Sequence, residues 1–253
     1  MTWMVESHGK EGARLRKPVT LIAGKFGSRH FGTRPYLEAA VQLTRKEAPL
    51  ALYIGAASGD DESFGTALCG LIAVAGAADV VWPKLAMRRR EAGAARTALE
   101  RADFVFIGGG DVEAGMDVLR GAKLVANLRA AAARGVVFAG MSAGAIMLGE
   151  RWIRWPRADA TDAEAETYEC LGIAPCALDT HGEGDRWGEA RSFASVRARE
   201  LKRKAKSYGI PSGGALVVRS GGRMHARGEP VPVFAASPRG AATIERTLPA
   251  EKG

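Results

Sequence analysis

A serine between two glycines stands where an apolar run gives way to helix formers. The stretch VVFAGMSAGAIMLGE, residues 136–150, passes through Gly-Met-Ser-Ala-Gly at this joint. A sharp strand-to-helix turn exposes a serine hydroxyl there, as a catalytic nucleophile requires, and small flanking residues relieve the crowding of the main chain. The simpler alternative is a loop serine that caps the helix. The pattern favours a nucleophile at Ser142, with the Ala143 N–H as a donor to a developing oxyanion.

A serine nucleophile needs a general base within hydrogen-bond reach, and histidine is the most frequent one. The chain has four histidines, and His181 follows the expected strand CALDT and opens a polar loop. His30 lies in the first loop and is a second candidate near the same site. His8 falls in the N-terminal leader, and His225 falls in a late hairpin that we expect at the surface. His181 is therefore the best candidate for the base.

Three consecutive glycines, Gly108 to Gly110, follow another apolar run, FVFI. The simpler interpretation is a tight turn with positive φ. The functional one is a set of exposed backbone N–H groups that complete an oxyanion hole. The segment GGGDVEAG lacks the Gly-x-Gly-x-x-Gly spacing of a dinucleotide-binding loop.

Short apolar runs alternate with Ala/Leu-rich helical stretches over the first 150 residues. We expect strands at 18–24, 49–58, 78–85, 103–112 and 135–144, and helices at 34–48, 63–75, 88–101, 112–120 and 122–134. Continuously apolar strands separated by helices are typical of a parallel sheet covered on both faces. The sequence thus predicts a doubly wound three-layer α/β sandwich, whose ligands collect at the carboxyl ends of the strands. Gly108 and Ser142 both lie at such ends.

The pattern changes after Glu150. We expect a short strand in ERWIRWP, a loop or short helix over 158–169, and a strand with a long polar loop over 172–190. A basic helix over 197–206 and antiparallel hairpins over 215–237 then close the edge of the sheet. We expect one domain over residues 18–246, with a flexible leader over 1–17 and a frayed tail over 247–253.

Composition excludes several classes of protein. The chain has 253 residues, of which 47% are hydrophobic and 25% charged, and no apolar run reaches the length of a membrane helix. Three cysteines without a pairing motif and a leader without an apolar core predict a cytoplasmic protein with reduced thiols. The net charge of +8 favours anionic partners. Because no nucleic-acid motif accompanies the basic run 197–206, we expect a solvated helix face there and no nucleic-acid partner.

Several segments resemble, in the same order, the dipeptidase E and cyanophycinase family of serine peptidases, which has the class I glutamine amidotransferase-like fold. They are FVFIGGGDV, GVVFAGMSAGAIML, LGIAPCALDTH, GDRWGEAR and GIPSGGALVV, and they span most of the chain from Pro18 to about Phe234. The resemblance implies Ser142 as nucleophile and His181 as base, with Gly109 or Gly110 and Ala143 as oxyanion donors. It implies neither a metal nor an organic cofactor.

The resemblance also places an acid of the catalytic triad on the segment just after the helix that follows the serine. Four acids lie there, namely Asp159, Asp162, Glu164 and Glu166, and Asp159 is nearest to the expected position. Such a carboxylate would hold the imidazole tautomer. Asp179 lies on the same strand face as His181 but is too close in sequence to be the usual partner.

Two positions depart from the family pattern. Gly182 stands where many members carry an aromatic residue, and Ser212 stands where many carry an acid. In the dipeptidase branch, basic groups hold the side chain of an N-terminal aspartate. Arg186 and Arg191 are candidates for such a clamp, with ordinary loop salt bridges as the alternative.

We therefore expect a serine hydrolase that acts on a small peptide, with acidic or cyanophycin-type peptides as the substrates that the resemblance implies. No membrane association is expected, and a homodimer is compatible with the sequence. The alternative is a sensor or binding module of the same fold that holds a small acidic ligand without catalysis. An amidotransferase is disfavoured because it normally carries cysteine at the position of Ser142.

Overall fold

The main sheet has eight strands in the order β14-β11-β10-β1-β5-β4-β2-β3. The structure, a computed structural model, describes residues 15–24, 32–157 and 159–251. The strands are β1 (Val19–Ile22), β2 (Leu50–Ile54), β3 (Asp79–Val81), β4 (Phe104–Ile107), β5 (Val137–Met141), β10 (Ala215–Val218), β11 (Met224–Arg227) and β14 (Ala250–Glu251). Strands β1 to β5 pair in parallel, whereas β10 is antiparallel to both β1 and β11. The predicted mostly parallel sheet with an antiparallel edge is confirmed.

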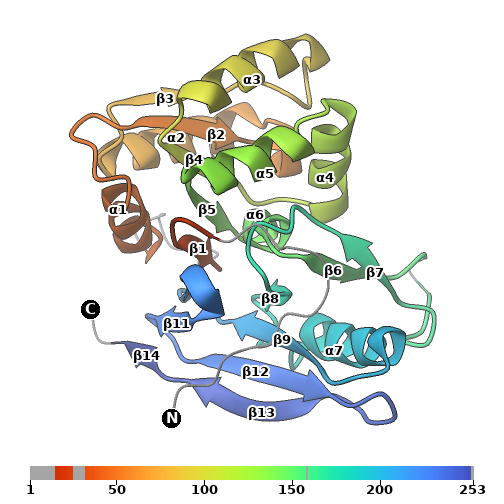
Figure 1. Cartoon of the computed structure of the whole chain (residues 1–253). Coiled ribbons are helices and arrows are strands. Elements are labelled where there is room, and N and C mark those ends of the chain that lie inside the picture. Colours follow the sequence, from red (N-terminus) through yellow and green to blue (C-terminus); the bar gives the residue numbers. More distant parts are fainter. Residues whose placement is uncertain (1–14, 25–31, 158, 252–253) are drawn as a thin grey trace.

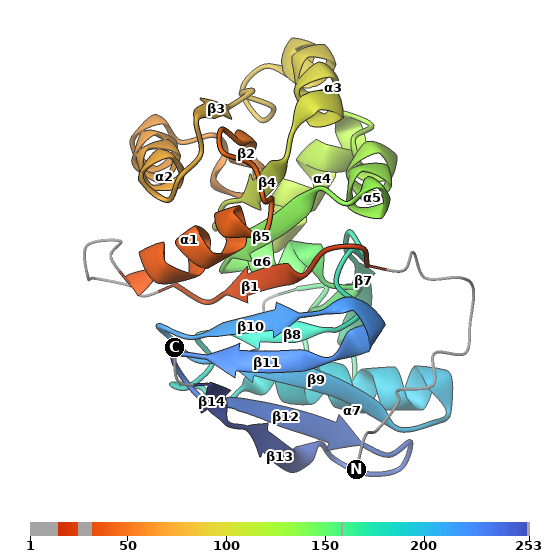
Figure 2. The same ribbon diagram turned by 60° about the vertical axis from the view of Figure 1, so that its left-hand side comes forward.

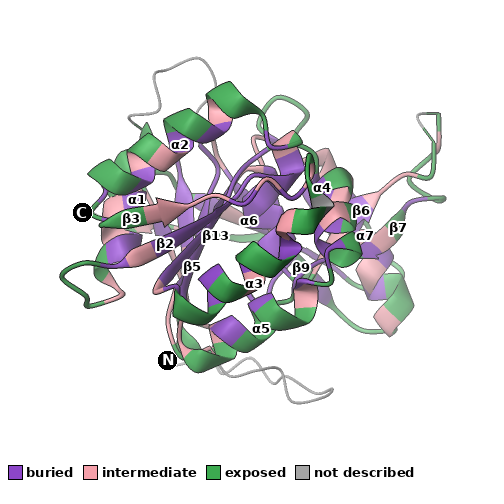
Figure 3. Ribbon diagram, turned by 90° about the horizontal axis from the view of Figure 1, so that it is seen from above, coloured by how far each residue is buried: buried purple, intermediate pink, exposed green. Residues whose placement is uncertain are grey.

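Helices cover both faces of the parallel strands (Figures 1 and 2). They are α1 (Arg34–Gln42), α2 (Glu62–Val74), α3 (Ala92–Arg101), α4 (Val112–Gly121), α5 (Val125–Arg134) and α6 (Ala143–Leu148). Leu37 of α1 packs in one core layer with Phe106, and Leu99 of α3 packs in the other with Phe138. Figure 3 shows the buried strands between helices whose outer faces are exposed. This layering confirms the predicted α/β sandwich.

A second sheet, in the order β13-β12-β9-β8, lies beside the antiparallel edge of the first (Figures 1 and 2). Its strands are β8 (Leu178–Thr180), β9 (Ala205–Ile210), β12 (Val231–Ala236) and β13 (Thr243–Leu248). Helix α7 (Gly188–Leu201) packs on β9 and β12 through a small apolar core that includes Ala194 and Phe234. Strands β6 (Arg151–Arg154) and β7 (Glu166–Glu169) form a separate hairpin. His181 comes directly after β8, so the second sheet positions the predicted general base.

The structure differs from the sequence predictions in the second half of the chain. The tail is not frayed at 247–251, because these residues continue β13 and form β14, which pairs with β11. The acidic segment 158–169 ends in β7 instead of a loop or short helix. The basic run is helical only to Leu201, since Ala205 and Lys206 belong to β9. In each case a distant strand supplies hydrogen bonds that local composition does not reveal.

Three observations concern the predicted environment of the chain. The cysteines Cys69, Cys170 and Cys176 are free thiols. Within the described ranges, every helix is too short or too polar to cross a membrane. Most of the predicted leader, residues 1–14, lies outside the described residues.

Candidate active site

Ser142 lies on a strained turn at the carboxyl end of β5. Its φ of 52° and ψ of −123° fall outside the conformations that residues with a side chain normally adopt. Its N–H donates to the carbonyl of Ile22 on β1 at 2.8 Å, and its half-buried side chain makes no capping hydrogen bond to α6. The interpretation of Ser142 as a simple helix cap is therefore not supported, and the predicted strand-to-helix turn is present.

Glycine is required on both sides of this turn by close main-chain packing. A methyl group on Gly140 would lie 2.4 Å from the carbonyl oxygen of Gly144. One on Gly144 would lie 2.2 Å from the carbonyl oxygen of Ile107, at the end of β4. Real carbon atoms do not approach oxygen so closely, so the serine turn can pack against β4 only without these side chains.

The glycine triplet borders the serine. A methyl group on Gly109 would lie 3.2 Å from the Cβ of Ser142 and 3.8 Å from its Oγ, whereas Gly110 has a φ of 140° that favours glycine. Among the described residues, no acceptor takes the backbone N–H of Gly109, Gly110 or Ala143. The structure thus brings two of the predicted oxyanion donors, Gly109 and Ala143, to the neighbourhood of the serine hydroxyl.

His181 follows β8 with a φ of 64° and is half-buried. Its backbone N–H donates to the carbonyl of Ile210 at 3.3 Å, and its ring Nδ1 lies 3.0 Å from the hydroxyl oxygen of Ser212. Burial lowers the pKa of His181, while a hydrogen bond with the backbone of Ala23 and the negative charge of Glu183 act to raise it. The net shift favours a neutral imidazole, the form that accepts a proton.

The end of β1 links the serine to the histidine. Ser142 hydrogen-bonds to the carbonyl of Ile22, and the backbone of the next residue, Ala23, lies close enough to the imidazole of His181 to raise its pKa. Ser142 and His181 therefore both adjoin the end of β1, Ser142 at Ile22 and His181 at Ala23. His8 and His30 lie outside the described residues.

The family model of Peptidase family S51 matches residues 25–225. The chain belongs to peptidase family S51. It is thus a serine peptidase of the dipeptidase E and cyanophycinase family, as the sequence motifs predict.

Two solved structures resemble this S51 peptidase in fold. A peptidase from an acI-B1 Actinobacterium has a TM-score of 0.69 and 18% sequence identity, over 95% of this chain and 97% of that one. A protein of Listeria monocytogenes EGD-e named after peptidase E has a TM-score of 0.57 and 15% identity, over 83% and 98% of the two chains. These matches support the class I glutamine amidotransferase-like fold. A search of curated protein sequences finds no match.

In this S51 peptidase, the space next to Gly182 is filled by Trp187, which the sequence motifs did not identify as part of the site. A methyl group on Gly182 would lie 2.7 Å from Cε3 of the Trp187 ring, and one on Gly209 of β9 would lie 2.5 Å from the same atom. The ring of Trp187 also lies near Phe234, at 6.3 Å between centroids. Trp187 thus occupies the room beside Gly182, the position at which the family resemblance leads us to expect an aromatic residue.

Asp179 lies beneath the histidine loop with only 4% of its surface exposed. Its Oδ2 accepts a hydrogen bond from the backbone N–H of Ala190 in the first turn of α7, at 3.3 Å. Burial, and then the nearby carboxylate of Glu189, raise the pKa of Asp179 to about 7. The structure therefore gives Asp179 a role in holding α7 against β8.

The acid predicted for the triad lies on an exposed connection. The side chain of Asp159 is 83% exposed and forms an ion pair with Arg157 at 3.0 Å, between β6 and β7. The other acids of this segment also contact neighbours: Asp162 accepts from Trp155, Glu164 pairs with Arg157, and Glu166 pairs with Arg154. These contacts give no support to the prediction of Asp159, because the side chain observed at Nδ1 of His181 is that of Ser212.

The two predicted substrate-binding arginines differ in their surroundings. The guanidinium of Arg191 donates to the carbonyl of Arg186 at 3.0 Å and lies 5.3 Å from the ring centroid of Phe234. Arg191 therefore fastens the histidine loop to the second sheet. Arg186 has an exposed side chain on that loop and a φ of 59°. Both residues are exposed, and among the described residues the guanidinium of Arg186 has no hydrogen-bond or ion-pair partner.

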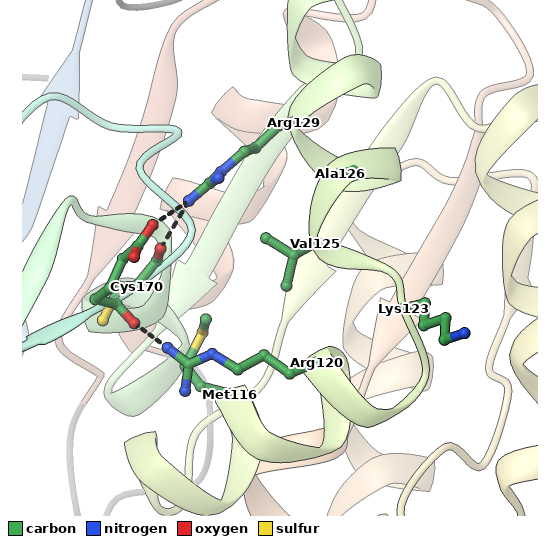
Figure 4. A pocket seen from close by; sticks show the side chains of 8 residues that line it. Met116, Arg120, Lys123, Val125, Ala126, Arg129 and Cys170 are labelled. Carbon is green, nitrogen blue, oxygen red and sulfur yellow. Dashed lines mark hydrogen bonds and ion pairs between the residues drawn. The ribbon is translucent and has the colours of Figure 1, made fainter.

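A cavity of about 320 Å³ lies between α4, α5 and the end of β7, and none of the predicted site residues lines it (Figure 4). Its two arginines point toward the chain around Cys170. Arg120 donates to the carbonyl of Glu169 at 2.5 Å, and Arg129 donates to that of Leu171 at 2.7 Å. These arginines bind the main chain and hold β7 to the helices. We therefore place the active site at Ser142 on chemical grounds rather than at this cavity.

Proposed function

We propose that this S51 peptidase hydrolyses an amide bond of a small peptide, with Ser142 as the nucleophile and His181 as the general base. The observation that carries the proposal is the strained turn of Ser142 beside Gly109, joined through the end of β1 to the imidazole of His181. A strained serine, a neutral imidazole and unpaired N–H groups are the parts that acyl transfer requires.

The reaction follows the usual order for serine hydrolysis. The Oγ of Ser142 attacks the carbonyl carbon of the substrate, and its proton passes to the imidazole of His181. The oxyanion accepts hydrogen bonds from the N–H of Ala143 and from Gly109 or Gly110. The imidazolium then protonates the leaving amine as the C–N bond breaks. Water, deprotonated by His181, attacks the ester carbonyl, and the proton returns to Ser142 as the acid product leaves.

The substrate that we propose carries a carboxylate near the bond that is cleaved. Arg186 has an exposed guanidinium five residues after His181, and the net charge of +8 attracts anions. Arg191 contributes less because its guanidinium already contacts Arg186 and Phe234.

The test uses an alkyl fluorophosphonate probe and a panel of dipeptides that includes members with an N-terminal aspartate. We expect the probe to label Ser142 in the wild type, and Ser142→Ala to lose labelling and to lower kcat by on the order of 10⁶. Ser63→Ala, on the exposed face of α2, is the matched control and should retain both activities. Full hydrolysis by Ser142→Ala would contradict the proposal.

A further inference from the structure

We infer that Ser212 is a positioning residue, whose hydroxyl holds the His181 imidazole in the orientation that catalysis needs. The inference rests on the proposed role of His181 as the base. It assigns to a neutral hydroxyl the position at Nδ1 that a carboxylate holds in a Ser-His-Asp triad. Glu183 supplies the negative charge from a second position.

The contact between Ser212 and His181 is built by tertiary structure. Oγ of Ser212 and Nδ1 of His181 are 3.0 Å apart, although the residues are 31 positions apart in the chain, and both are half-buried. Each follows a strand of the second sheet, since β8 and β9 run in parallel and pair Thr180 with Ile210. The two residues therefore emerge at the same end of neighbouring strands.

The main chain around Ser212 is anchored on both sides. The N–H of Ser212 donates to the carboxylate of Glu183 at 2.5 Å. The N–H of Gly213 donates to the carbonyl of Gly24, just after β1, at 2.7 Å. The hydroxyl is thus fixed relative to the strand end that also holds the N–H of Ser142. An anchored hydroxyl can orient the ring, because its own position does not depend on the ring.

The role proposed for the Ser212 hydroxyl specifies which nitrogen acts as the base. In the arrangement that we infer, the oxygen of Ser212 accepts a hydrogen bond from Nδ1–H, which leaves the lone pair of the neutral ring on Nε2. Nε2 then takes the proton of Ser142. The same oxygen still accepts from Nδ1–H in the imidazolium, but a neutral acceptor stabilises this cation less than a carboxylate does.

Glu183 compensates in part for the missing charge. Its carboxylate binds the N–H of Ser212, and its negative charge favours the protonated form of His181. Among the described residues, Glu183 is the charged group that acts on this ring. Orientation and charge, which one carboxylate provides in a Ser-His-Asp triad, are therefore divided between Ser212 and Glu183.

The experiment measures the rate of fluorophosphonate labelling at Ser142 against pH, together with the ¹⁵N signals of the His181 ring in the full-length protein. We expect Ser212→Ala to slow labelling about tenfold, as loss of one neutral hydrogen bond implies, and Ser212→Thr to restore it. Ser212→Ala and Glu183→Gln should shift the midpoint of the rising pH limb to lower pH, and Ser212→Asp should shift it to higher pH. A merely structural role would not produce shifts of opposite sign.

The ring spectrum decides the inference even where labelling fails. We expect Nδ1 to carry the proton in the neutral wild-type ring, and this preference to weaken in Ser212→Ala and return in Ser212→Thr. An unchanged tautomer and pH midpoint in Ser212→Ala would overturn the inference. If the wild type resists labelling while the Ser212 variants still show these spectral changes, the proposed nucleophile is contradicted and the positioning role of Ser212 is supported.

Discussion

The serine turn and the histidine loop meet at the end of β1, but they are held by different kinds of contact. The turn is packed through the main chain, because Gly144 lies against the carbonyls that end β4. The loop is held largely by side chains. Asp185 accepts hydrogen bonds from the N–H groups of Trp187 and Gly188, and Ser212 contacts the imidazole of His181.

The two kinds of contact should respond to different changes. A turn packed through its main chain has no room for added atoms. A loop held by polar and ionisable side chains depends instead on charge and pH. The contrast teaches that one active site can combine a nucleophile fixed by sterics with a base fixed by polar contacts. Substitutions in the serine turn and in the histidine loop test this contrast.

The largest effect is expected from Gly144→Ala. The added methyl group would lie 2.2 Å from the carbonyl oxygen of Ile107 and 2.5 Å from that of Gly108, and main-chain atoms cannot move aside cheaply. We expect the free energy of unfolding to fall by about 3 kcal/mol or more, measured by urea denaturation. The control is Gly93→Ala on the exposed side of α3, where a methyl group meets nothing within 4 Å. It should stabilise the protein by about 0.5 to 1 kcal/mol. Equal effects of the two substitutions would remove the steric basis of the contrast.

A smaller, pH-dependent effect is expected from Asp179→Asn beneath the histidine loop. The pKa of Asp179 is raised from 3.8 to about 7 in the folded state. Such a carboxyl group stabilises the fold fully below pH 3.8, where it is protonated in both states, and this contribution is lost as the pH rises through 7. Asparagine keeps an acceptor for the N–H of Ala190 without the charge.

The stability of Asp179→Asn relative to the wild type should therefore rise from pH 4 to pH 8, by on the order of 4 kcal/mol. Urea denaturation at the two pH values measures this difference. A difference that does not change with pH would show that the buried carboxyl group titrates alike in the folded and unfolded chain.

The same contrast explains how far the sequence predicts the molecule. The five parallel strands and the serine turn are visible as local patterns, because apolar runs and the Gly-x-Ser-x-Gly spacing each lie within a few residues. The second sheet is not visible in this way, since β9 and β12 pair across more than twenty residues of chain. For the same reason, the tail appears frayed in sequence although Leu248 pairs with Val231.

The site follows the same rule. Ser142 and His181 are identified by their neighbours in the chain, whereas the contact of His181 with Ser212 arises only when β8 and β9 pair. The ring of Trp187 is equally hard to foresee, although glycine at both Gly182 and Gly209 is a signal that a large group packs there. The departure at Ser212 is visible in the sequence, but its contact with the imidazole is not.

The smallest effect is expected from Asp159→Asn, which tests the acid that the sequence predicts. Its carboxylate is 83% exposed and paired with Arg157, and an exposed ion pair contributes little. We expect the rate of fluorophosphonate labelling to stay within about twofold of the wild type, whereas loss of a triad carboxylate costs about 10⁴-fold. Ser212→Ala, measured alongside, provides the scale for a group that does contact the ring. A loss for Asp159→Asn larger than that for Ser212→Ala would mean that the β6–β7 connection closes over His181 during catalysis. The orientation of the base would then depend on a movable segment, and the contrast with the fixed serine turn would be stronger than the structure alone implies.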